Sequence, residues 1–179
     1  LPMMNVLNGG KHATGSSDFQ EFMLIPKGAE SFSQAVQIGA EIFQSLKQEI
    51  ARAGVSTAVG DEGGFTYPIQ SANTEMLDIL MQATKRAGYS PGKDVVFALD
   101  VAASEFYQQE RYVLATEERA LSSEMMIQYL ADIADRYPVV SIEDGLAEDD
   151  WDGWMSLTQR LQGVQLVGDD ILVTNPTRL

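Results

Sequence analysis

Hydrophobic residues gather in three short runs in the second half of the chain, and each run stops at a carboxylate. The runs are Asp94–Asp100 (DVVFALD), Pro138–Glu143 (PVVSIE) and Val164–Asp169 (VQLVGD). Short runs of β-branched and large apolar residues predict buried strands. Because helix-like segments separate the runs, the pattern predicts an α/β fold with a parallel sheet.

A different spacing, with apolar residues three and four positions apart, predicts helices over Ser33–Ala53 and Asn73–Ala87. Gly54 and Gly88 follow them as left-handed C-caps. No strand is expected between these two helices. The predicted buried face of the first consists of Val36, Ala40, Phe43, Leu46, Ile50 and Ala53.

Two more helices are predicted further along, one capped by Ser122 and one by Asp149 or Asp150. The inward residues of the first are Met126, Leu130, Ile133 and Tyr137, and those of the second are Trp151, Trp154, Leu157 and Leu161. At the start of the chain, Met3–Leu7 and Phe19–Ile25 are predicted to pair as an antiparallel hairpin, and a small surface hairpin is expected at Arg111–Leu114.

The three acids that end the apolar runs are Asp100, Glu143 and Asp169. In parallel α/β sheets, active-site residues lie at the carboxyl ends of the strands, so these side chains are expected to meet at one edge of the sheet. Three carboxylates at one point repel each other unless a cation lies between them, and oxygen ligands of this kind suit Mg²⁺. The alternative is that each acid caps the helix that follows it.

Two glycine-rich loops are further candidates. The segment NGGKHATGSSD at 8–18 contains the only histidine, His12, which is either a functional residue or an ordinary solvated side chain. The segment VGDEGGF at 59–65 surrounds Asp61 and Glu62 with three glycines. Such glycines let the backbone approach a ligand and hold carboxylates in place, whereas the alternative is a flexible acidic turn.

The composition narrows the class of protein. The chain has 179 residues, of which 45% are hydrophobic, and this suits one sizeable core. The formal net charge of −14 disfavours non-specific nucleic-acid binding. Cysteine is absent, which excludes disulfides and thiolate metal sites, and no apolar run is long enough to span a bilayer. The apolar beginning, and a last run that no helix follows, suggest a piece of a longer polypeptide.

Several stretches together resemble the enolase (phosphopyruvate hydratase) family, with the bacterial type as the best fit. They are MNVLNGGKHA at 4–13, DFQEFMLIP at 18–26, STAVGDEGGF at 56–65, ALDVAASEFY at 98–107, YPVVSIEDGLAEDDWDGW at 137–154 and LVGDDILVTNP at 166–176. The resemblance implies an incomplete TIM-like β/α barrel that opens with two strands and two helices, with about five of the eight barrel strands present. Residues 1–179 are then part of the C-terminal catalytic domain, without the N-terminal domain or the last part of the barrel.

The resemblance also implies a function: the magnesium-dependent dehydration of 2-phosphoglycerate to phosphoenolpyruvate in glycolysis. The enzyme is then expected to be cytoplasmic and a homo-oligomer, as a dimer or larger, with a small-molecule substrate. Asp100, Glu143 and Asp169 match the magnesium ligands, and Glu62 matches the acid that assists departure of hydroxide. His12, Gln20 and Glu21 match residues at the substrate, whereas Asp61, Asp144 and Asp170 are expected to be structural neighbours.

The family's base, a lysine, and its phosphate-binding residues have no counterpart in this chain. We therefore expect the 179 residues alone to be inactive and only marginally folded. Two alternatives remain open: another magnesium-dependent barrel enzyme that abstracts a proton from carboxylate substrates, or a truncated, non-catalytic binding module.

Overall fold

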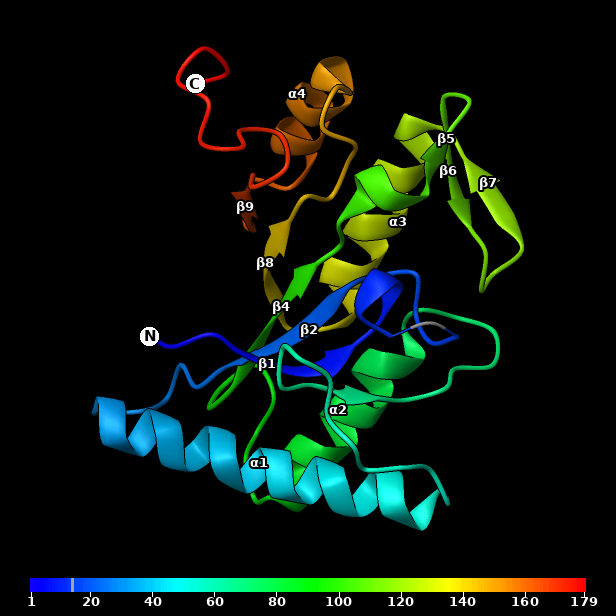
Figure 1. Cartoon of the computed structure of the whole chain (residues 1–179). Helices are drawn as coiled ribbons and strands as arrows, with labels where there is room; N and C mark the ends of the chain where they lie inside the picture. The colour runs from blue at the N-terminus through cyan, green and yellow to red at the C-terminus, as the bar shows by residue number, and fades with distance from the viewer. Residues whose placement is uncertain (14) are drawn as a thin grey trace.

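A mixed six-stranded sheet, in the order β3-β1-β2-β4-β8-β9, forms the centre of the protein. Figure 1 shows the computed structural model, which describes residues 1–13 and 15–179. The strands are β1 (Met4–Asn8), β2 (Glu21–Ile25), β3 (Phe65–Thr66), β4 (Val96–Asp100), β8 (Val139–Glu143) and β9 (Gln165–Val167). The parallel pairing of β4 with β8 and of β8 with β9 confirms the sheet expected from the three acid-ended runs.

The opening hairpin is also confirmed, because β1 and β2 pair antiparallel, and β2 then pairs antiparallel with β4. The expectation that no strand lies between the first two helices is wrong, since β3 pairs parallel to β1. Phe65 in this strand is fully buried, and its ring stacks on that of Phe43 with centroids 4.4 Å apart. A strand of two residues is too short to leave a periodic signal in the sequence.

Within the described residues, four α-helices flank the sheet: α1 (Phe32–Arg52), α2 (Glu75–Arg86), α3 (Ser123–Arg136) and α4 (Trp151–Arg160). Figure 1 shows α1 and α2 together on one side, with α3 and α4 near β4, β8 and β9. Ser31, Ser122 and Asp150 cap α1, α3 and α4 through their side chains, so Asp150 rather than Asp149 is the cap of the last helix. Gly54 and Gly88 have φ angles of 75° and 91°, as expected for left-handed C-caps.

The buried face of α1 differs in part from the predicted one. It consists of Ala35, Ile38, Gly39, Ile42, Leu46 and Ile50. Leu46 and Ile50 are therefore confirmed, whereas Ala40 and Ala53 are exposed and Val36 is 44% exposed. Gly39 explains the rotation, because a Cβ atom there would lie 2.2 Å from Sδ of Met4. A glycine in the helix lets α1 approach β1 closely, and its face turns toward that contact.

The predicted inward residues of α3 are all buried: Met126, Leu130, Ile133 and Tyr137. For the last helix the prediction holds for Trp154, Leu157 and Leu161. It is wrong for Trp151, which is 48% exposed, with the Arg178 guanidinium 5.2 Å from its ring centroid. The small surface hairpin is confirmed and has a further strand.

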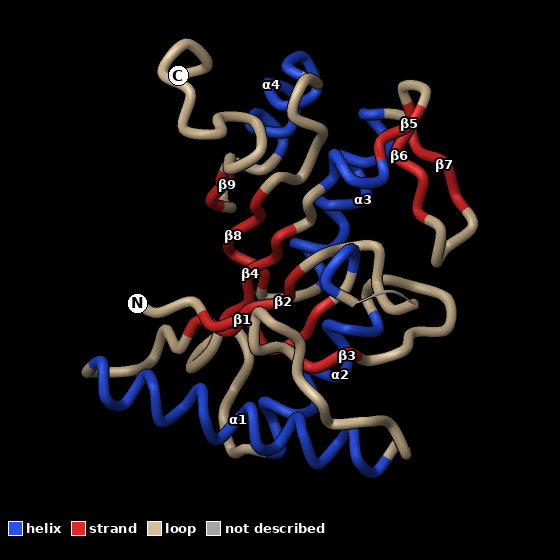
Figure 2. The backbone as a smooth tube through the Cα atoms, viewed as in Figure 1, coloured by secondary structure: helices blue, strands red, loops and turns tan. Residues whose placement is uncertain are grey.

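The backbone tube in Figure 2 shows this second sheet apart from the main one, formed by β5 (Tyr107–Gln108), β6 (Arg111–Leu114) and β7 (Arg119–Leu121). Two short 3-10 helices, η1 (Gly10–His12) and η2 (Ala103–Phe106), complete the described elements. None of the helices in the described ranges combines the length and apolarity needed to cross a membrane.

Candidate functional site

Strand register brings the acids of three neighbouring strands to one edge of the sheet. Asp100 at the end of β4 is the register partner of Glu143 at the end of β8 and of Glu21 at the start of β2. Glu21 belongs to this edge because β2 runs antiparallel to β4, so its first residue meets the last residue of β4. Glu143 in turn faces Val167 of β9, and Asp169 follows two residues later. Since Ser122 and Asp150 cap α3 and α4, the strand-end acids do not cap these helices.

The Asp100 carboxylate is held from two sides. Nε2 of Gln20 donates to Oδ2 at 3.0 Å, and the backbone N–H of Ala102 donates to Oδ1 at 3.1 Å. Burial nevertheless raises the pKa of Asp100, and it outweighs these two hydrogen bonds. Each oxygen keeps a free lone pair, so the carboxylate is oriented and still able to bind a cation.

Glu143 has the most perturbed carboxyl group of the edge. Burial, followed by the negative charges of Asp100, Asp144 and Asp169, raises its pKa to about 7. The pKa of Glu21 is raised for similar reasons, first by burial and then by Asp100. Carboxylates that oppose each other's ionisation in this way favour a cation as a neighbour.

Asp144 positions the segment after β9. Its side chain is buried, Oδ1 accepts the backbone N–H of Asp169 at 3.1 Å, and Oδ2 accepts that of Asp170 at 2.9 Å. Burial raises the pKa of Asp144 to about 6, although these two hydrogen bonds act in the opposite direction. Its contacts are those of a structural neighbour. In the sequence, this role of Asp144 is indicated only by its place directly after Glu143 in the segment IEDG.

His12 approaches the same edge from the loop between β1 and β2. It lies in η1, and its Nδ1 is 3.6 Å from Oε1 of Glu21. The His12 side chain is 31% exposed and the Glu21 side chain is 17% exposed. Lys11, one residue earlier, pairs instead with Glu105 of η2. The loop therefore directs the imidazole toward Glu21, whereas the Lys11 ammonium group lies at Glu105.

The glycine-rich turn at 59–65 brings Glu62 close to the same edge. The charge of Glu62 contributes to the raised pKa of Glu21, after burial, Asp100 and His12 in importance. Nδ2 of Asn8 donates to the backbone oxygen of Gly64 at 3.2 Å, and a Cβ atom on Gly64 would lie 2.5 Å from Oδ1 of Asn8. The turn is thus fastened to the end of β1, and this close approach requires glycine.

Comparison with known protein families matches residues 1–179 to a family model described as "Enolase, C-terminal TIM barrel domain". The chain belongs to this enolase family. In TIM barrels the active site lies at the carboxyl ends of the strands, which is the edge where Asp100 and Glu143 lie. The mixed sheet and its helices agree with the predicted incomplete TIM-like barrel of this family.

Enzymes of the enolase superfamily use one or two Mg²⁺ ions. The three predicted ligands, Asp100, Glu143 and Asp169, are all carboxylates, as a hard cation prefers. Within residues 1–13 and 15–179, however, no group of three or more His, Asp or Glu side chains is gathered closely enough to hold a metal ion. Asp169 is exposed, and its backbone is tied to Asp144. The carboxylate oxygens of this enolase chain are therefore ligands of the type that Mg²⁺ prefers, but in this structure the side chains lie too far from one another to bind one ion together.

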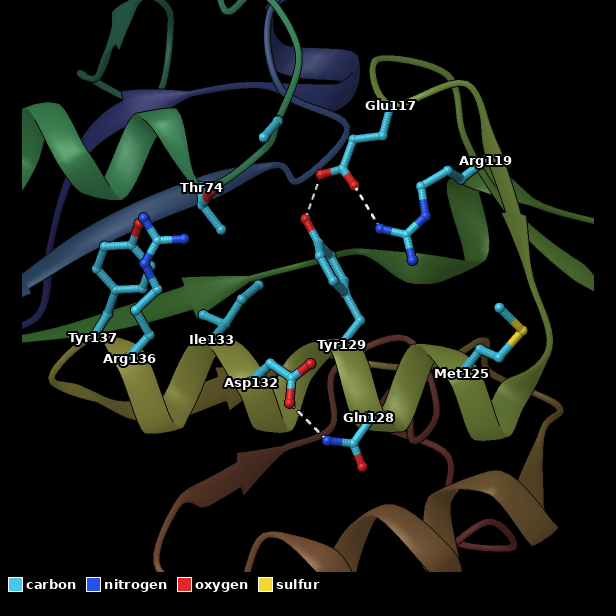
Figure 3. Close-up of a pocket in the computed structure, with 11 residues that line it drawn as sticks. Thr74, Glu117, Arg119, Met125, Gln128, Tyr129, Asp132, Ile133, Arg136 and Tyr137 are labelled. Atoms are coloured by element: carbon cyan, nitrogen blue, oxygen red, sulfur yellow. Dashed lines mark hydrogen bonds and ion pairs between the residues drawn. The ribbon is translucent and has the colours of Figure 1, made fainter.

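Figure 3 shows a cavity whose lining includes none of these carboxylates. It has a volume of about 470 Å³ and is bounded by α3 and by the turn between β6 and β7. Its lining includes Glu117, Arg119, Tyr129, Arg136 and Tyr137. None of the site residues predicted for this enolase chain borders it, so the candidate site is the carboxylate edge.

Proposed function

We propose that this chain is part of a phosphopyruvate hydratase of the bacterial type, which dehydrates 2-phosphoglycerate to phosphoenolpyruvate in glycolysis. The observation that carries the proposal is the register of Glu21, Asp100 and Glu143 across three neighbouring strands, in a chain that belongs to the enolase family. The approach of His12 and Glu62 to this same edge supports it.

Asp100, Glu143 and Asp169 would hold Mg²⁺ in this proposal. When bound, the ion supplies positive charge that stabilises the enediolate formed from the substrate carboxylate. Gln20 and the Ala102 amide would keep the Asp100 carboxylate in one orientation. Asp144 would hold the backbone of Asp169 against the end of β8.

The remaining residues act on the substrate. Glu62 would donate a proton to the departing hydroxide, and the attachment of the glycine-rich turn to Asn8 would hold Glu62 at this edge. His12 and Glu21, 3.6 Å apart, would close over the substrate and exclude water. The base is a lysine or histidine in this superfamily, and we assign it to a later barrel strand of the parent protein. Residues 1–179 would then be the first part of a C-terminal catalytic domain in a cytoplasmic homo-oligomer.

The direct test uses the parent protein that contains this chain. It is assayed for turnover of 2-phosphoglycerate with Mg²⁺, and in parallel for turnover of acid sugars. We expect phosphoenolpyruvate from the first substrate and no reaction with the second. Turnover of acid sugars alone would assign the site to a different reaction of the superfamily, and turnover of neither substrate would favour a binding role.

Two variants of the parent link any activity to this edge. Glu143→Gln is expected to weaken Mg²⁺ binding and to abolish turnover. Glu124→Gln makes the same chemical change on an exposed position of α3 and serves as the control. An active Glu143→Gln enzyme with normal Mg²⁺ affinity would show that the reaction takes place elsewhere.

A further inference from the structure

The side chain of Asn73 lies immediately before α2, is 1% exposed, and satisfies all of its hydrogen-bonding capacity within the protein. Oδ1 accepts the Ser17 hydroxyl at 2.9 Å and the Asp18 backbone N–H at 2.7 Å. Nδ2 donates to Oδ2 of Asp18 at 3.0 Å and to Oε1 of Glu117 at 3.2 Å. These partners also determine the orientation of the amide, because a flipped amide would turn its NH₂ group toward the Asp18 N–H.

Two of these partners form the base of the loop that carries His12. The carbonyl of Ser17 accepts the N–H of Gly10, the first residue of η1, at 2.7 Å. The hydroxyl of Ser17 also accepts the backbone N–H of Phe19 at 3.0 Å. Asn73 is therefore connected to the short helix containing His12 through one residue, Ser17, which is itself buried.

The opposite side of Asn73 is held by the turn between β6 and β7. The Glu117 side chain is 7% exposed, and its Oε1 also accepts the N–H of Asn73 at 3.0 Å. Figure 3 shows that the same carboxylate accepts two further hydrogen bonds. The Tyr129 hydroxyl donates to Oε1, and Nη1 of Arg119 donates to Oε2 at 3.1 Å. Thr116 in this turn donates its hydroxyl to the Ser16 carbonyl at 3.2 Å. The loop, the segment that leads into α2 and the turn are thus joined by buried and partly buried polar contacts.

We infer that Asn73 is a positioning residue for the proposed dehydration, which acts by holding the loop so that His12 stays over Glu21. This inference rests on the proposed function. Buried polar networks of this kind specify one arrangement, and removal of one member leaves its partners without hydrogen bonds. Misplacement of a substrate-closing residue by about 1 Å can lower the rate about 100-fold.

The test is a double-mutant cycle on the parent enzyme, with Asn73→Ala, His12→Ala and the pair. In the wild-type background, we expect Asn73→Ala to lower kcat/KM about 10- to 100-fold. In the His12→Ala background, we expect the same substitution to lower kcat/KM only slightly. Its Mg²⁺ affinity should equal that of the wild type. Thr84→Val, which removes a buried hydroxyl within α2 that donates to the Leu80 carbonyl, is the matched control and should leave kcat/KM unchanged.

A cost of Asn73→Ala that is the same with and without His12 would overturn the inference, because it would reveal a general loss of stability. If Asn73→Ala does not fold, Ser17→Ala removes one partner of the same amide and enters the same cycle. Hydrogen exchange of the loop separates this inference from the proposed reaction. If the wild-type parent does not dehydrate 2-phosphoglycerate, faster exchange in Asn73→Ala still upholds the anchoring and unchanged exchange refutes it.

Discussion

Asp100 and Glu143 face each other across the β4–β8 ladder, each at the last residue of its strand. Neighbouring parallel strands that end in register place their terminal side chains on one edge, so two half-buried carboxylates share the same small region. Burial raises the pKa of both groups, and the charge of Asp100 adds to the effect at Glu143. Such an arrangement costs stability unless a cation compensates it, which is why it indicates function rather than packing.

The metal ligands and the general acid should separate in their effects. Asp169→Asn in the parent protein replaces a charged ligand and should weaken Mg²⁺ binding, as measured by calorimetry. Glu62→Gln changes the proton donor but no ligand, so it should keep the Mg²⁺ affinity and lose the dehydration of 2-phosphoglycerate. Equal Mg²⁺ affinity in both variants would refute this division of roles.

Asp144→Asn should weaken Mg²⁺ binding even though Asp144 is not proposed as a ligand. Its two carboxylate oxygens receive the N–H groups of Asp169 and Asp170, and an amide would turn an NH₂ group toward one of these donors. Loss of a group that orients a ligand typically lowers metal affinity about 10- to 100-fold. The measurement is Mg²⁺ titration of the variant and the wild-type parent at one pH.

Asp149→Asn is the control for this change, because Asp149 is exposed and its contact is with Arg178 near the surface. Its Mg²⁺ affinity should match that of the wild type. A normal affinity in Asp144→Asn would mean that the backbone of Asp169 keeps its place without the Asp144 carboxylate.

Much of the fold could be predicted because its signals are local. The runs that became β4 and β8 are apolar and end in an acid, and Ser122 is followed by apolar residues at helical spacing. The orientation of α1 could not be predicted, because it depends on the contact of Gly39 with Met4, residues that lie 35 positions apart. Likewise, the two residues of β3 form a strand only because β1 offers them an edge.

The candidate site also has one part that the sequence could predict and one part that it could not. Asp100, Glu143 and Asp169 stand out in the sequence by their position at strand ends, and the fold brings the first two into register. The contribution of Asn73 could not be found, because it depends on hydrogen bonds to residues 44 to 56 positions away. Polar residues before a helix are common as caps, and only the tertiary structure distinguishes an anchor from a cap.

Gly64→Ala should displace the turn that carries Glu62. The new methyl group would lie 2.5 Å from Oδ1 and 2.9 Å from Cγ of Asn8, and 3.0 Å from the backbone of Leu7. Relief of such overlap requires the turn to leave the end of β1, at a typical cost of about 1–3 kcal/mol in the free energy of unfolding. We expect turnover of 2-phosphoglycerate to fall sharply, as measured by steady-state kinetics of the parent enzyme.

Gly63→Asn is the matched control in the same turn. Gly63 has a φ angle of 80° with nothing within 4 Å of the position where a Cβ atom would lie, and asparagine tolerates this backbone region. Its effect on turnover should be much smaller than that of Gly64→Ala. If both variants lose turnover equally, flexibility of the turn, and not its contact with Asn8, would explain the need for glycine.

Glu75 should make the stability of α2 dependent on pH in the acid range. Its carboxylate accepts the backbone N–H groups of Gln70, Ser71 and Ala72 ahead of the helix. Burial is the largest single influence and raises the pKa of Glu75, but these hydrogen bonds together outweigh it and lower the pKa below its ordinary value of 4.5. A carboxyl group with a lowered pKa stabilises the folded state above the unfolded pKa, and the stabilisation disappears as the pH falls through the folded pKa.

Glu75→Gln should therefore lower the Tm of the parent protein at pH 7, and the difference from the wild type should shrink as the pH falls below about 4.5. Glu124→Gln is the matched control, since Glu124 also lies in the first turn of a helix but accepts no hydrogen bond within the described part of the chain. Its Tm difference should be small at every pH. A Glu75→Gln difference that stays constant from pH 7 to pH 3 would contradict this prediction, because the difference would then not depend on ionisation of the Glu75 carboxyl group.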